Sequence, residues 1–311
     1  MKRERVVLRE RGVELALLDF GGQGPLALLH HANGFCGALW EGVATPLRER
    51  FRVVAFDARG HGDSSVPPWP EGYDWNQFPL DLLALVEHLL QARGLERVAL
   101  GIGHSFGGTT TAVAAALRPD LFERVAMIDP VLTPPEWREG ELPPELREAG
   151  SDHRVGMAEA ARTRRHVWPS PEAVVDSWSK PGRPFSRWRP DLLQLYAREG
   201  FRRRPDGSIE LKCSGEVEAA VYEAGGSLDA FPYAARIRCP VLIQRASESQ
   251  FPLEVYERFA EPIPDARIET IEGSHLIVME RPDEVAASLL RFAGGEHSRP
   301  SAEPSSAQMR E

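Results

Sequence analysis

Short, continuous apolar runs recur along the first 130 residues and alternate with stretches in which apolar residues return at helical spacing. The runs are apolar at successive positions, as in parallel strands covered by helices on both faces. We expect these strands at residues 13–20, 26–30, 52–56, 97–102 and 125–129. Helices are expected over residues 78–91 and 106–117. This alternation predicts an α/β fold with a mostly parallel, doubly wound sheet.

The alternation stops near Pro130, and a segment of about one hundred residues follows without a convincing buried strand. It contains prolines, arginines, helical fragments and four of the seven tryptophans. Buried-strand patterns then return at residues 240–245 and 267–271, followed by an amphipathic helix over 282–292. The pattern predicts a core of residues 1–130 and 232–293, interrupted by a helical cap (lid) over 131–231. The polar, Ser/Pro-rich residues 294–311 are expected to be disordered.

Composition and charge limit the partners, the cofactors and the cellular compartment that we expect for the protein. The net charge is -9 and the isoelectric point is near 5.6, which disfavours nucleic acid and anionic membranes as partners. Three widely spaced cysteines without a CxxC pair exclude a disulfide framework and a Cys-rich zinc site, and they suit a reducing cytosol. No apolar signal core follows the N-terminus. We therefore expect a cytoplasmic protein that acts on a small molecule, with no cofactor and no metal. The sequence leaves the oligomeric state open.

The strongest chemical motif is Gly-His-Ser-Phe-Gly at residues 103–107, between an expected strand and an expected helix. A serine on such a sharp turn has a strained backbone, and side chains two residues away would collide with the strand and the helix. Its hydroxyl projects near a helix N-terminus, where developing negative charge is favoured. The motif predicts that Ser105 is a catalytic nucleophile.

A serine nucleophile needs backbone N–H groups that bind the oxyanion of the tetrahedral intermediate. We expect one from Phe106, the residue after the nucleophile. The other is expected just after the strand at 26–30, where Asn33 is the preferred donor and Ala32 and Gly34 are its neighbours. His31 is expected to brace this loop.

His275 follows the last expected strand, so it is placed to reach Ser105 as the general base. The third member of the triad has two candidates. Glu248 follows the strand at 240–245, whereas Asp129 ends the strand after the nucleophile's helix. Either carboxylate could orient the imidazole and stabilise the imidazolium, and the sequence leaves the choice open.

Together these motifs resemble the α/β-hydrolase superfamily, in its lidded branch of small bacterial esterases, lactonases and carbon–carbon hydrolases. The landmarks span roughly residues 13–293 and include His-Ala-Asn-Gly-Phe at 31–35 and Asp-Ala-Arg-Gly-His-Gly-Asp-Ser-Ser at 57–65. Gly-His-Ser-Phe-Gly-Gly at 103–108 and Gly-Ser-His at 273–275 complete them. The resemblance implies an α/β-hydrolase fold and a serine hydrolase, but it says almost nothing about the substrate.

Two departures from the family pattern bear on the site. Ala32 replaces the usual glycine of the oxyanion loop, and Ser249 occupies the position where the acid loop usually carries aspartate. The second departure leaves Glu248 as a shifted substitute or moves the acid to Asp129. Related dehalogenases resemble the latter arrangement, with a carboxylate about twenty-four residues after the nucleophile.

The function expected from these residues is acyl transfer from a small, partly apolar ester to water, as in a carboxylesterase or lactonase. A carbon–carbon bond hydrolase and a cofactor-free perhydrolase or haloperoxidase are alternatives on the same triad. A ligand-binding protein on the same fold is the non-enzymatic alternative.

Overall fold

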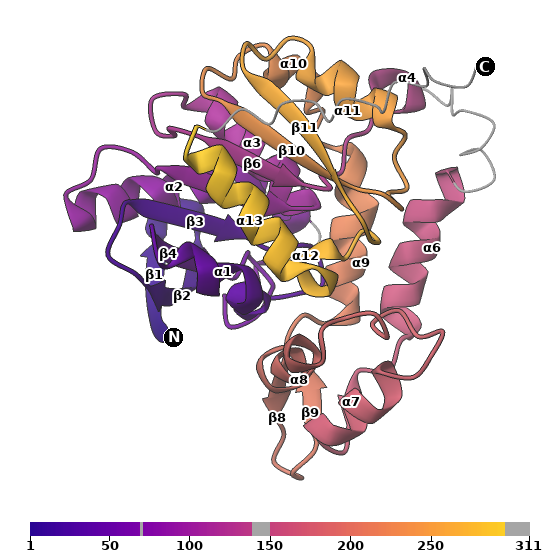
Figure 1. Cartoon of the computed structure of the whole chain (residues 1–311). Helices are drawn as coiled ribbons and strands as arrows, with labels where there is room; N and C mark the ends of the chain where they lie inside the picture. Colours follow the sequence, from indigo (N-terminus) through magenta and orange to yellow (C-terminus); the bar gives the residue numbers. More distant parts are fainter. Residues whose placement is uncertain (69–70, 139–149, 296–311) are drawn as a thin grey trace, which may run out of the picture.

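The computed structural model describes residues 1–68, 71–138 and 150–295 (Figure 1). Within them, the central sheet has eight strands in the order β1-β2-β4-β3-β5-β6-β10-β11. β1 and β2 pair antiparallel with each other, β2 pairs antiparallel with β4, and the remaining strands run parallel. The strands are β1 (Lys2–Leu8), β2 (Val13–Gly21), β3 (Leu26–His30), β4 (Arg52–Phe56), β5 (Leu100–His104), β6 (Val125–Ile128), β10 (Val241–Ala246) and β11 (Ala266–Ile271). The predicted mostly parallel, doubly wound sheet is confirmed.

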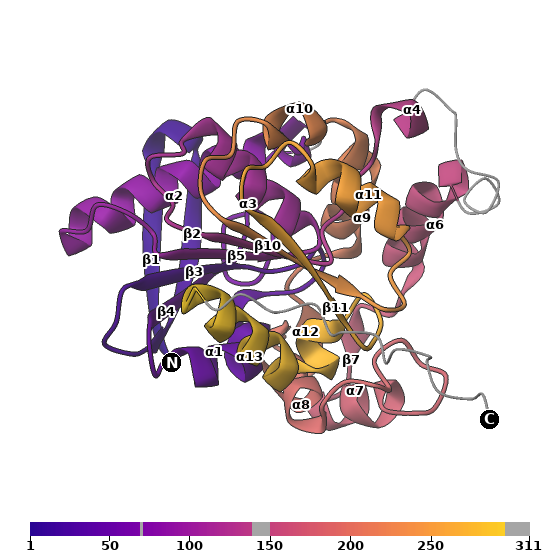
Figure 2. The same ribbon diagram turned by 45° about the horizontal axis from the view of Figure 1, so that its top comes forward.

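Helices cover both faces of the sheet, which explains why its inner strands are apolar at successive positions. On β3, Leu26 and Leu28 pack into one core cluster, while Ala27 and Leu29 pack into the other. Figure 2 shows α2, α3, α10 and α11 on one face and α1, α12 and α13 on the other. These helices are α1 (Glu41–Leu47), α2 (Gln77–Arg93), α3 (Phe106–Leu117), α10 (Phe231–Ala234), α11 (Leu253–Ala260), α12 (Ile277–Glu280) and α13 (Pro282–Ala293).

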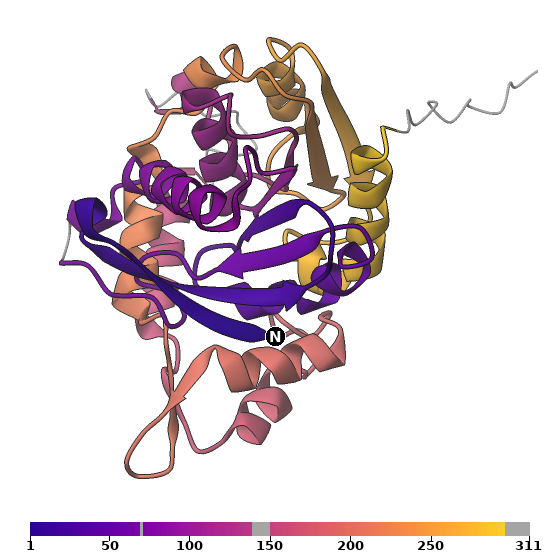
Figure 3. The same cartoon turned by 90° about the vertical axis from the view of Figure 1, so that its left-hand side faces the viewer.

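The segment between β6 and α10, here called the insertion, contributes no strand to the central sheet within the described residues. Its described helices are α4 (Pro135–Arg138), α6 (Gly150–Thr163), α7 (Pro171–Trp178), α8 (Pro190–Glu199) and α9 (Gly215–Glu223). It also contains a small antiparallel sheet of β7 (Val167–Trp168), β9 (Ile209–Leu211) and β8 (Phe201–Arg203). Figure 3 shows the β8–β9 hairpin projecting from the lower end of the molecule.

Three sequence expectations differ from the structure. The sequence shows no convincing buried strand in the insertion, but β7, β8 and β9 form there; they are two or three residues long, too short for a periodic pattern to identify. β1 is an additional edge strand; its first four residues are charged, and only Val6 and Leu8 in it are buried. The strand expected at 97–102 lies two to three residues later, as β5. The expected disorder of 294–311 falls almost wholly outside the described residues.

Candidate active site

Ser105 lies on the sharp turn between β5 and α3. Its φ of 58° and ψ of -125° are unusual for a residue with a side chain. Two glycines make the turn possible. A Cβ atom on Gly103 would lie 2.1 Å from the carbonyl oxygen of Gly107, and a Cβ atom on Gly107 would lie 2.5 Å from that of His31. The predicted elbow therefore forms, and it brings α3 directly against the loop after β3.

His275 follows β11 and points its imidazole at the serine. The distance from Nε2 of His275 to Oγ of Ser105 is 2.9 Å. Its loop is fixed from two sides. Glu280 accepts hydrogen bonds from the backbone N–H and the hydroxyl of Ser274 (2.9 and 2.8 Å), and His104 Nε2–H donates to the carbonyl oxygen of His275 (2.7 Å). Burial lowers the pKa of His104 to about 3, so this imidazole is neutral and serves as a structural donor.

Asp129 is the carboxylate that contacts His275, with 2.6 Å between Oδ2 and Nδ1. The side chain is fully buried. Its oxygens also accept hydrogen bonds from the Ala246 backbone N–H (3.0 Å), the Ser249 hydroxyl (3.1 Å) and the Tyr256 hydroxyl (3.0 Å). Burial opposes the charge, but the hydrogen bonds outweigh it and keep the pKa of Asp129 below its ordinary value. The carboxylate is therefore ionised at neutral pH.

Glu248, the other predicted candidate, lies elsewhere. Its carboxylate is exposed and pairs with Arg187 of the insertion, at 2.6 Å between Oε2 and Nη1. Of the two candidate acids that the sequence leaves open, Asp129 and not Glu248 contacts His275. The physical reason is the backbone: Asp129 leaves β6 with a φ of 40°, which turns its side chain toward the imidazole.

The loop at residues 31–35 lies opposite His275. His31 braces it, because Nδ1–H donates to the Ala32 carbonyl oxygen (2.8 Å) and Nε2 accepts from the Ala58 backbone N–H (3.0 Å). The side chain of Asn33 lies between His61 and Glu218. Its Oδ1 is 3.0 Å from Nε2 of His61, and its Nδ2 donates to the Glu218 carbonyl oxygen at 3.0 Å. Any oxyanion contact from Asn33 must therefore come from its backbone N–H, as expected from the sequence.

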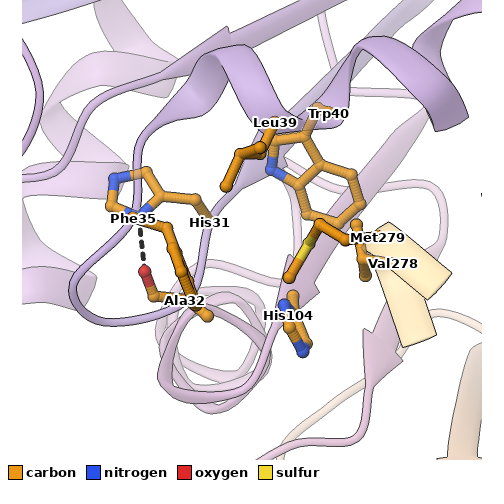
Figure 4. Close-up of a pocket in the computed structure, with 8 residues that line it drawn as sticks. All are labelled: His31, Ala32, Phe35, Leu39, Trp40, His104, Val278 and Met279. Carbon is orange, nitrogen blue, oxygen red and sulfur yellow. Dashed lines mark hydrogen bonds between the residues drawn. The ribbon is translucent and has the colours of Figure 1, made fainter. Parts of the chain in front are cut away.

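Phe106 is the first residue of α3, so its backbone N–H has no acceptor within the helix. A small pocket lies between the loop at 31–35, the elbow and α12. Figure 4 shows its side chains around a common space. The lining residues are His31, Ala32, Phe35, Leu39, Trp40, His104, Val278 and Met279. All of them except the two histidines are apolar.

Sequence reasoning missed three residues that support the triad. Ser249 and Tyr256 donate to Asp129, and Glu280 holds the loop before His275. Ser249 carried a signal, because it occupies the position expected for the family's acid. Tyr256 and Glu280 carried none, because their roles depend on where α11 and α12 pack.

Residues 1–68, 71–138 and 150–295 lack two features. In these ranges no cluster of three or more His, Cys, Asp or Glu side chains is arranged to bind a metal ion. None of the helices in these ranges combines the length and the apolar character needed to cross a membrane.

Comparisons with known proteins agree with this architecture. Residues 25–282 match the family model described as "alpha/beta hydrolase fold". The 2-(acetamidomethylene)succinate hydrolase of Mesorhizobium japonicum is 39% identical over 108 residues, which cover 35% of this chain and only 36% of that protein. The 3-oxoadipate enol-lactonase 2 of Acinetobacter baylyi is 25% identical over 291 residues, covering 92% of this chain and 96% of that protein. The crystal structure of E-2-(acetamidomethylene)succinate hydrolase is similar in fold, with a TM-score of 0.76, 24% identity, and coverage of 94% of this chain and 99% of that one.

Proposed function

The chain belongs to the α/β-hydrolase fold family, and on that premise we propose that it is a serine hydrolase of small, partly apolar ester-type substrates. One observation carries the proposal: Ser105, His275 and Asp129 form a continuous hydrogen-bonded relay, with separations of 2.9 and 2.6 Å. Each member matches a role in nucleophilic acyl transfer. An ester linkage also agrees with the lactonase among the relatives, whose alignment covers nearly the whole chain.

The proposed reaction has two halves. In the first, Oγ of Ser105 attacks the ester carbonyl carbon while its proton passes to Nε2 of His275. The backbone N–H groups of Phe106 and Asn33 bind the oxyanion. The C–O bond to the alcohol then breaks, and the leaving alcohol takes the proton from His275. In the second half, His275 removes a proton from water, which attacks the acyl-serine; the C–O bond to Ser105 breaks, the acid is released, and His275 returns the proton to Oγ of Ser105. Asp129 stabilises the imidazolium in both halves.

We propose further that the insertion is a cap over this site, with the core formed by residues 1–130 and 232–293 and the cap by residues 131–231. The support is an aromatic contact across the two parts. The ring of Phe35 lies 5.9 Å from Phe185, 5.5 Å from Trp188 and 5.4 Å from Tyr196, centroid to centroid. These aromatic rings beside the loop at residues 31–35 favour an apolar group on the substrate.

A burst of p-nitrophenol from short-chain p-nitrophenyl esters tests the proposal. Ser105→Ala is expected to abolish the burst and turnover, because the acyl-enzyme cannot form. Ser186→Ala, which removes a surface hydroxyl that donates to the Arg183 carbonyl oxygen in the insertion, is the matched control and should keep the burst. Full ester turnover by Ser105→Ala would contradict the mechanism.

Other substrates and a covalent label separate the alternatives. A carbon–carbon hydrolase would cleave vinylogous diketones faster than esters, and a perhydrolase or haloperoxidase would require peroxide and acetate. A ligand-binding protein would fail to react with a fluorophosphonate at Ser105.

A further inference from the structure

The loop that carries Asn33 is held by two helices of the insertion, far away in the sequence. The Tyr196 hydroxyl of α8 donates to the Gly34 carbonyl oxygen at 2.9 Å. The Asn33 side chain donates to the Glu218 carbonyl oxygen of α9 at 3.0 Å. Both hydrogen bonds are buried, so losing either would leave a polar group without a partner and without water. The oxyanion loop is therefore anchored to the insertion as well as to the core.

The first of these contacts reaches the proposed oxyanion donor through two rigid peptide planes. The Gly34 carbonyl shares a plane with the Phe35 N–H. That N–H donates to the Ala32 carbonyl oxygen at 3.2 Å, and the Ala32 carbonyl shares a plane with the Asn33 N–H. Orienting the Gly34 carbonyl therefore orients the Asn33 N–H. Hydrogen bonds linked in this way also polarise one another, so the Asn33 N–H becomes a stronger donor.

Tyr196 is well suited to hold these linked hydrogen bonds and peptide planes in place. Only 1% of the residue is exposed, and its ring stacks on Trp178 at 5.8 Å between centroids, with 22° between the planes. Burial raises the pKa of the Tyr196 hydroxyl well above its usual value, so the hydroxyl stays protonated and donates. The donor is therefore fixed in position by packing and fixed in protonation by its surroundings.

Glu218, the second anchor, also lies against the loop at Gly34. Gly34 has a φ of 79°, and a Cβ atom there would lie 2.6 Å from the carboxyl carbon of Glu218. The buried Glu218 carboxylate is itself paired with Arg164 of the insertion. Gly34 is therefore enclosed by the insertion on its side-chain face as well as bonded at its carbonyl.

We propose that Tyr196 is a positioning residue for the oxyanion hole: it fixes the Gly34 carbonyl and, through the two peptide planes, the direction of the Asn33 N–H. The inference rests on the proposed serine hydrolase function. It makes assembly of the oxyanion hole dependent on docking of the insertion against the core.

Tyr196→Phe tests the inference, because it keeps the ring and removes only the hydroxyl. Outright loss of an oxyanion donor costs about 10²–10³ in kcat, so a loosened donor is expected to cost about tenfold. KM for p-nitrophenyl esters should stay within about twofold, because the donor acts in the transition state. Phenylboronic acid, whose adduct with Ser105 resembles the tetrahedral intermediate, should bind more weakly by the same factor as the loss in kcat. Tyr233→Phe on α10 is the matched control and should behave like the wild type.

Titration of the active site separates a loss of folded protein from a loss of function. Rates are divided by the concentration of Ser105 that a fluorophosphonate labels at completion, so that unfolded protein does not count as slow enzyme. Unchanged kcat and unchanged phenylboronic acid affinity in Tyr196→Phe would overturn the inference, as would a loss confined to KM. If instead wild type fails to label, or Ser105→Ala keeps full turnover, the proposed function fails.

Discussion

Replacing Asp129 by asparagine tests the identity of the acid with a change of one atom. Oδ1 of Asp129 accepts from the Ala246 backbone N–H and the Tyr256 hydroxyl, while Oδ2 accepts from His275 and the Ser249 hydroxyl. The hydroxyls can turn and accept, but the N–H of Ala246 can only donate. The asparagine must therefore keep its oxygen toward Ala246 and present its NH₂ group to His275.

That orientation puts the imidazole in the wrong tautomer. When the asparagine NH₂ donates to Nδ1 of His275, the ring proton moves to Nε2, which then cannot accept the proton of Ser105. In the well-studied serine protease triad this change lowers kcat by about 10⁴-fold. At about 1.36 kcal/mol for each factor of ten, the transition state loses about 5.4 kcal/mol of stabilisation. We expect a loss of this size for Asp129→Asn.

The assay is kcat for short-chain p-nitrophenyl esters at neutral pH, with circular dichroism to confirm that each variant is folded. Glu248→Gln is the matched control. Its ion pair with Arg187 is exposed, so its loss should change kcat by less than about twofold. A kcat of Asp129→Asn within tenfold of the wild type, or a larger loss in Glu248→Gln, would refute the assignment of the acid.

Two more predictions concern the elbow and its surroundings. Gly107→Ala places a methyl group 2.5 Å from the His31 carbonyl oxygen, so we expect a loss of about 1–3 kcal/mol in the free energy of urea unfolding and a lower kcat. For Gly156→Ala, the new methyl group has no atom of the described residues within 4 Å beyond the adjoining residues and its own helix backbone, so this change should not destabilise; equal effects of the two changes would contradict the steric argument. Burial lowers the pKa of His30 from 6.5 to about 3, so between these values the unfolded state binds more protons and stability falls as the pH falls. His30→Phe should reduce that slope by up to about 1.4 kcal/mol per pH unit in urea unfolding between pH 6 and 4; an unchanged slope would show that His30 does not cause it.

The parallel strands of the sheet and α3 were predictable because the residues within each element are themselves mostly apolar or small. The expected ranges 26–30, 52–56 and 106–117 coincide with β3, β4 and α3. β3 and β4 are apolar at four of their five positions and α3 consists mostly of small residues, and neighbouring elements do not change that pattern. β1 and the strands of the insertion were not predicted, because edge strands and strands of two or three residues bury too little surface to leave a period in the sequence.

The acid was not predictable, for a reason that the sheet makes clear. β6 and β10 are adjacent parallel strands, with Ile128 opposite Gln244. Residues that follow either strand therefore reach the same edge near His275. The choice depends on the positive φ of Asp129 and on Arg187, which reaches from the insertion to pair with Glu248. Neither interaction is local in sequence.

The three residues of the relay are spaced unequally along the sequence. Ser105 and Asp129 belong to one β-α-β unit, β5-α3-β6, whose strands are hydrogen-bonded in register. His275 is 170 residues from Ser105 in the sequence and arrives with the last strand of the sheet. A break in the exposed turn at residues 205–207, between β8 and β9, would leave the nucleophile and the acid on one fragment and the base on the other. Hydrolysis would then require the two fragments to reassemble, which makes this architecture a natural basis for a split-enzyme reporter.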